Sequence, residues 1–297
     1  MQNEQPKIDF FRRRESGEKI TATIDFIREN SHMWLRWCVL PLLPLCAILG
    51  WLTASHTVEE SPYGPFLWDL DLTDELVGFS FKNESLFAPF TLVTAVVLLL
   101  IFTVTGALMY LYQYREQRLK GVKWDELLPA LKHAFPGAAA ITVAGYFILF
   151  FLGSATFSLQ VLLLLAFLSL ALYAPTCHVG CYPPHRAFGH SLSLGVNTWA
   201  GTFLVTLGLL LILLFIRSVP DALMSLLDSY LSGLVFYNSF NNDVYNIILI
   251  AMNTLQYWVA FACFSVLLIG AGYQYGHAEE KFSSVSLYED VRHFDEI

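Results

Sequence analysis

Long apolar stretches, separated by shorter polar connections, set the pattern of this chain. A helix needs about 20 mostly apolar residues to cross a hydrocarbon layer about 30 Å thick. Six stretches approach that length, and they cover residues 34–54, 89–112, 137–153, 159–174, 200–216 and 246–272. Only residues 154–158 separate the third stretch from the fourth, so we expect a tight helical hairpin there. The pattern predicts an all-α membrane protein with six transmembrane helices.

The composition agrees with this prediction. The 297 residues are 56% hydrophobic and only 14% charged. Soluble domains average about 45–50% apolar and about 25% charged residues. The composition therefore excludes a water-soluble globular domain.

Basic residues in the connections predict the orientation, because Lys and Arg are retained on the cytoplasmic face of a membrane. With the N-terminus inside, 15 of the 17 Lys and Arg residues fall on the cytoplasmic side. We therefore expect both termini in the cytoplasm and a location in the bacterial cytoplasmic (inner) membrane. The chain then divides into a cytoplasmic N-terminal segment (1–33), a six-span membrane domain (34–275) and an acidic cytoplasmic tail (276–297).

An amphipathic segment precedes each span that leads outward. Residues 17–30 carry apolar side chains at helical spacing. Two further sets precede the third and fifth spans: Trp124, Leu127, Leu128 and Leu131, and then Phe188, Leu192, Val196 and Trp199. Such stripes are typical of helices that lie in the membrane interface. Because the second and sixth spans also end on Tyr-Gln-Tyr, the pattern predicts three repeats of an interfacial helix plus two spans.

Three polar segments carry further expectations. Residues 218–245 form an outer connection, and we expect its amphipathic part to lie on the lipid surface. The three arginines at 12–14 follow Phe10 and Phe11, a pattern typical of an anionic-lipid anchor whose rings enter the lipid, and equally of a charge cluster that only sets topology. The acidic tail should leave the membrane after Tyr275 and either dock on the protein's own cytoplasmic helices or bind a partner.

Cys177, Cys181, His185 and His190 form the densest group of potential metal ligands. Thiolates and imidazoles suit zinc or copper, and this spacing could close a tetrahedral site. The alternative is a short cytoplasmic loop with reduced thiols, in which the adjacent Pro-Pro pair enforces an extended turn. The thiols are separated by three residues rather than the common two, so we favour the loop and assign no metal and no cofactor.

Neutral polar residues mark one face of the sixth span. Asn246, Asn253 and Gln256 recur at i, i+7 and i+10, which places them on one helical stripe. The stripe could line a site for a solute or a lipid headgroup, but such residues more often form hydrogen bonds between helices. The interiors of the predicted spans contain no Asp, Glu, Lys or His, which argues against a charge-driven transporter.

The segments FFRRRESGEKI (10–20), IDFIREN (24–30) and RAFGHS (186–191) resemble a loose group of bacterial six-span membrane proteins. This group, of Bacteroidetes type, includes small uncharacterised integral membrane proteins and the membrane domain fused to some glycerophosphodiester phosphodiesterases. The resemblance implies a six-span fold. It implies no activity and carries over no catalytic residue, because we expect no hydrolase domain in this chain.

The sequence contains no serine nucleophile elbow, no zinc-protease motif and no P-loop. We therefore expect a non-enzymatic integral membrane scaffold or accessory subunit of a bacterial envelope complex. Its expected partners are membrane lipids and other proteins or a second copy of the chain, and not nucleic acid. The alternative is a transporter or binding protein for a neutral or amphiphilic, lipid-like solute, which would use the polar stripe of the sixth span.

Overall fold

The structure, a computed structural model, describes residues 8–60, 89–115, 119–154, 171–236 and 242–283. Within these ranges every regular element is helical and no strand occurs. The α-helices are α1 Ser16–Trp34, α2 Leu43–Glu60, α4 Pro89–Tyr114, α5 Trp124–Ser154, α7 Tyr173–His178, α8 Pro184–Asn197, α9 Trp199–Phe236 and α10 Asn242–Ser283. A π-helix (Leu35–Val39) and a 3₁₀ turn (Leu40–Leu42) join α1 to α2.

Five helical segments of the described chain are long and apolar enough to cross a membrane. They are Ser16–Ser55, Pro89–Tyr114, Trp124–Gly145, Trp199–Leu227 and Val244–Ser283. The protein is therefore a multi-pass membrane protein, as the apolar pattern predicts. The fourth predicted span, 159–174, lies mostly outside the described residues, as does nearly all of the predicted hairpin at 154–158.

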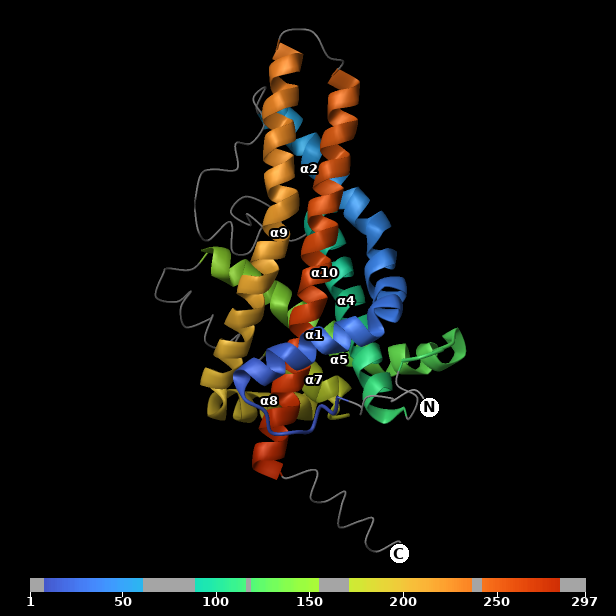
Figure 1. The fold of residues 1–297 in the computed structure, drawn as a ribbon, viewed down its shortest axis with the longest axis vertical. Coiled ribbons are helices and arrows are strands. Elements are labelled where there is room, and N and C mark those ends of the chain that lie inside the picture. The colour runs from blue at the N-terminus through green and yellow to red at the C-terminus, as the bar shows by residue number, and fades with distance from the viewer. Residues whose placement is uncertain (1–7, 61–88, 116–118, 155–170, 237–241, 284–297) are drawn as a thin grey trace, which may run out of the picture.

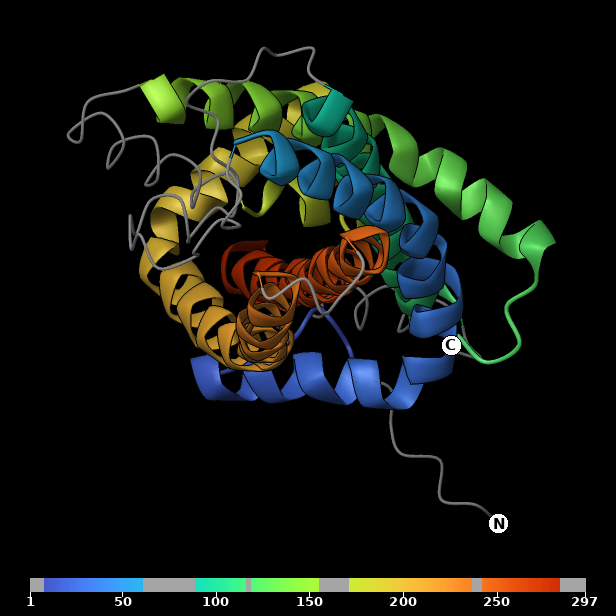
Figure 2. The same ribbon diagram turned by 90° about the horizontal axis from the view of Figure 1, so that it is seen from above.

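Helix α10 is the centre of the bundle. It extends through the bundle from end to end (Figure 1), and α9, α1, α2, α4 and α5 surround it when the bundle is seen from above (Figure 2). Contacts with α1, α2, α4, α7, α8 and α9 make it the element that joins the others. Gly50 lets α2 approach closely, because a β-carbon at this position would lie only 2.8 Å from the backbone nitrogen of Thr254 on α10.

The chain turns between α1 and α2. Asn30 leaves the helical region of backbone conformation (φ −112°, ψ 16°), at the residue where the predicted interfacial helix ends. Pro41 and Pro44 have no N–H to donate to the preceding turn, which accounts for the π and 3₁₀ turns around them. As a result α1 lies across α10, whereas α2 runs along it (Figure 1).

The predicted amphipathic segments gather at one end of the bundle, here called the α1 end (Figure 1). α1 and α8 are separate helices there, whereas the third segment forms the first turns of α5. The apolar stripe of α8 is exposed, as expected for a helix in the membrane interface. Its members are Phe188, Leu192, Val196 and, at the start of α9, Trp199.

The structure corrects two expectations about the connections. The outer connection predicted from residue 218 is helical through Phe236, as a continuation of α9 rather than a separate segment. The acidic tail predicted from residue 276 begins with the last turns of α10, which continues to Ser283, and the rest of the predicted tail, 284–297, lies outside the described residues. Glu279 and Glu280 lie in these turns and are buried rather than solvated.

The largest buried cluster among the described residues lies at the α1 end. Its five aromatic members are all fully buried, and they are Phe10, Phe26, Tyr112, Tyr273 and Tyr275. The ring centroids of Phe10 and Tyr273 are 4.5 Å apart, and those of Phe26 and Tyr112 are 4.7 Å apart. Aromatic rings bury large apolar areas, so this cluster fixes the α1 end as a packed unit.

Candidate functional site

The last turns of α10 bring polar side chains into the middle of the α1 end. Tyr273, Gln274, Tyr275, Glu279 and Glu280 are all buried. Helices α1, α7 and α8 pack around these turns. A buried polar group is costly unless it is hydrogen-bonded, so the partners of these side chains show how the site is built.

The N-terminal strap, residues 8–15, crosses α10 at Gly276. The backbone N–H of Ile8 donates a hydrogen bond to the Tyr112 hydroxyl at 3.1 Å. The carbonyl of Phe10 packs directly on Gly276, where a β-carbon would collide with it. The ring of Phe10 is therefore buried in protein, and the predicted insertion of this ring into lipid is wrong.

Lys19 of α1 is buried beside α10, with 2% of its surface exposed. Its Nζ donates to Gln274 Oε1 at 2.8 Å, and Gln274 Nε2 donates in turn to Thr202 Oγ1 of α9 at 3.1 Å. This chain of bonds joins α1, α10 and α9. The amide oxygen of Gln274 is neutral, so it orients the ammonium group without neutralising its charge.

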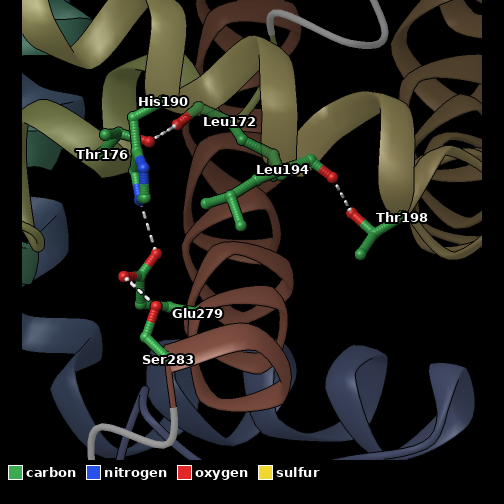
Figure 3. Close-up of polar contacts among 7 residues, drawn as sticks. All are labelled: Leu172, Thr176, His190, Leu194, Thr198, Glu279 and Ser283. Atoms are coloured by element: carbon green, nitrogen blue, oxygen red, sulfur yellow. Dashed lines mark hydrogen bonds and ion pairs between the residues drawn. The ribbon is translucent and has the colours of Figure 1, made fainter.

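A second polar contact joins α8 to α10 (Figure 3). His190 Nε2 lies 2.8 Å from Glu279 Oε2, and Ser283 Oγ donates to the other carboxylate oxygen at 3.1 Å. The imidazole also stacks on Tyr182 with 4.6 Å between ring centroids. Burial and the nearby Glu279 carboxylate raise the pKa of the Tyr182 phenol, so it remains neutral. The carboxylate of Glu279 thus holds α8 against the central helix.

The structure separates the four residues considered as metal ligands. Cys177 and Cys181 line one pocket of about 270 Å³ together with His133. His185 is exposed and His190 is engaged with α10. Burial raises the pKa of Cys177 to about 11, so its thiol is protonated at physiological pH. Among the described residues no group of three or more His, Cys, Asp or Glu side chains is placed to hold a metal ion.

His178, at the end of α7, is buried against two glycines. Its ring occupies the space that side chains would fill at Gly106 of α4 and Gly137 of α5. Neither ring nitrogen has a hydrogen-bond partner among the described residues. Burial, with a smaller contribution from His133, lowers its pKa to about 3, so the ring is neutral at physiological pH. It acts as an aromatic packing group between three helices.

The polar stripe of α10 is divided between two environments. Gln256 Nε2 donates to Asp221 Oδ1 of α9 at 3.1 Å, and Arg217 Nε lies 3.5 Å from the other carboxylate oxygen. This contact supports a role in helix packing for Gln256. Asn253 is buried, whereas Asn246 and Gln256 are half-buried.

Sequence reasoning did not single out Lys19, Gln274, His178 or Glu279. The sequence places Glu279 in the acidic tail, because this residue follows the last predicted span. The available signal was the continued helix-forming sequence after Tyr275, in which two glutamates and an alanine favour further helical turns. Lys19 carried no signal beyond its place among the isoleucines of an amphipathic helix.

No protein-family model matches the chain, and no solved structure matches it. The functional argument therefore depends on the geometry of the α1 end.

Proposed function

We propose that this multi-pass membrane protein is a non-enzymatic scaffold or accessory subunit of a bacterial envelope complex. The proposal includes six spans in three repeats, both termini in the cytoplasm and a location in the inner membrane. The resemblance to bacterial six-span proteins supports it, as does the gathering of α1, α8 and the first turns of α5 at one end. The excess of basic residues in the same segments supports a cytoplasmic position for the α1 end.

The observation that carries the proposal is the pre-organised geometry of the α1 end. Lys19, Gln274 and Thr202 tie three helices together, and the contact between His190 and Glu279 ties in a fourth. These polar groups hold the protein's own helices in place. A rigid surface loses little conformational freedom when it binds another protein, and this is the property that a scaffold needs.

Photo-crosslinking from single positions tests the scaffold. Crosslinking amino acids at Lys123 and Arg186, which are exposed at the α1 end, should capture the same protein in native membranes. A crosslinker at Phe215, which is 76% exposed on α9 within a spanning segment, provides the control and should capture lipid or nothing. The captured protein must also retrieve this chain when it is purified in turn. If Lys123 and Arg186 capture no protein, or capture the same products as Phe215, the scaffold proposal fails; capture of a second copy supports a homo-oligomer.

A second candidate function is binding of a neutral or amphiphilic solute along α10. It is favoured by Asn253, which is 8% exposed and whose amide forms no hydrogen bond with another described residue. Replacing Asn253 with Leu should then release a bound lipid that native mass spectrometry detects in the wild-type protein. The matched control is Asn246→Leu on the same stripe. Equal retention of lipid in wild type and both variants would exclude this site.

A further inference from the structure

Five basic side chains meet where the N-terminal strap passes α10. They come from the strap, from α1 and from the end of α10, and they are Arg13, Arg14, Lys19, His277 and Lys281. The backbone N–H of Arg14 donates to His277 Nδ1 at 3.0 Å, and Arg13 Nη2 donates to the backbone carbonyl of Glu280 at 3.4 Å. Arg13 and Lys281 are exposed, Arg14 and His277 are half-buried, and Lys19 is buried. The cluster therefore leads from the surface of the α1 end into its interior.

Three carboxylates near the cluster take part in other contacts. Glu18 accepts a hydrogen bond from the backbone N–H of Glu15, Asp9 accepts one from Phe11, and Glu279 is paired with His190. In the described part of the chain, no ion pair involves the side chain of Arg13, Arg14, Lys19 or Lys281. Within the described residues these four side chains therefore lack an ion-pair partner, although Asp9 and Glu18 lie close enough to act on Arg14 electrostatically.

Several donors of the cluster are also unused. Arg14 Nη1 is inaccessible to solvent and has no hydrogen-bond partner in the described part of the chain, although the guanidinium group lies over the Tyr273 ring at 5.3 Å. Lys19 has three N–H donors and uses one of them on Gln274. His277 accepts at Nδ1, which assigns its proton to Nε2 and makes that nitrogen a donor. Buried donors and charges without partners are costly, so a bound anion would stabilise this arrangement.

We propose that Arg13, Arg14, Lys19, His277 and Lys281 form a binding site for a phosphate group at the α1 end. Guanidinium groups match phosphate oxygens with paired N–H donors, and an ammonium group adds a compact positive charge. Gln274, itself held by Thr202, keeps the ammonium group of Lys19 in position. Because α1 is an interfacial helix, the phosphate belongs either to the headgroup of an anionic lipid or to a small soluble molecule. The site is independent of whether the protein acts as a scaffold.

Binding can be measured on the full chain with two probes. The first is phosphatidylglycerol in nanodiscs, compared with nanodiscs of pure phosphatidylcholine, and the second is inorganic phosphate in detergent, compared with chloride at equal ionic strength. The readout is the rise in unfolding temperature and the apparent Kd derived from it. The double variant Arg13→Gln/Lys281→Gln should weaken binding about 25-fold, because each basic residue near an anionic surface contributes about fivefold.

The matched control is Arg28→Gln, which removes an exposed arginine of α1 that is paired with Asp25 and lies outside the cluster. This variant should bind inorganic phosphate within about twofold of wild type, since its charge is separated from the cluster by more than two helical turns, and it should weaken binding of phosphatidylglycerol less than the double variant does. Both variants change exposed residues. Lys19→Met offers a second test at a buried position, where the rise in unfolding temperature caused by the anion should disappear whatever the stability of the anion-free variant.

The two probes separate the sources of the phosphate. Stabilisation by phosphatidylglycerol alone assigns a lipid headgroup, and stabilisation by inorganic phosphate assigns a soluble ligand. No stabilisation by either probe, or equal weakening in Arg28→Gln and the double variant, would overturn the proposal. A Lys19→Met variant that keeps the full anion effect would overturn it as well. None of these outcomes depends on protein partners, so the scaffold proposal is tested separately.

Discussion

Replacing Phe10 with alanine measures how strongly the N-terminal strap is held in the protein. The ring is fully buried and lies 4.5 Å from the ring of Tyr273 and 6.1 Å from that of Tyr112, centroid to centroid. Truncation of a buried phenylalanine costs about 3–5 kcal/mol, which includes the cavity that remains. At about 2–4 °C per kcal/mol for a chain of this order of size, Phe10→Ala should lower the unfolding temperature in detergent by about 10 °C.

The neighbouring residue provides the control. Phe11 is half-buried and contacts Tyr275 only by its edge, with 6.2 Å between ring centroids, so Phe11→Ala should cost about 1–2 kcal/mol. Lipid insertion makes the opposite prediction. If Phe10 entered the membrane, its truncation would leave stability in detergent unchanged and would weaken only the attachment of the strap to vesicles. A wild-type unfolding temperature for Phe10→Ala, or equal losses for Phe10→Ala and Phe11→Ala, would refute the packing argument.

Three further changes test other parts of the fold. Lowering the pH from 7 to 5 should reduce the free energy of unfolding by about 2 kcal/mol, because His178 has a pKa of about 3 in the folded protein and about 6.5 in the unfolded chain. The contribution of His178 to stability is present above the unfolded pKa and is lost as the pH falls below it. His178→Phe should flatten this part of a pH titration of unfolding. Gly50→Leu should push α2 away from α10 and lower the free energy of unfolding by at least about 1–3 kcal/mol, because the added side chain meets the backbone at Thr254. Unchanged thermal stability would show that the two helices do not approach closely. Gln256→Leu should lower the free energy of unfolding by about 1 kcal/mol. In a double-mutant cycle with Asp221→Asn, the two stability losses should be coupled. Strictly additive losses would contradict the hydrogen bond between α9 and α10.

The apolar pattern predicted the helices well because the thickness of the membrane fixes how long each apolar stretch must be. Each span must satisfy a fixed length, and each interfacial helix must separate lipid from water along one stripe. Asn30 illustrates the precision of such signals, since the predicted end of the first interfacial helix coincides with its kink. The ends of α9 and α10 were placed too early, because helical structure continues beyond the apolar run when the next residues still favour helix.

The contacts of the candidate site depend on residues that are far apart in the chain, and this is why the pattern did not reveal them. The local sequence around Phe10 is the same whether the ring enters lipid or the interior of the protein. Both surroundings remove the apolar ring from water, so the hydrophobic effect favours them equally. The outcome is decided by Gly276, which lets the strap lie flat on α10, and by the aromatic residues around it. The same reasoning applies to Lys19. On an isolated amphipathic helix the ammonium group of Lys19 would reach water. In the folded protein the strap and α10 cover it. A charge that the sequence pattern predicts at the surface is therefore buried. A site of this kind can be recognised only once the partners of each buried charge are known.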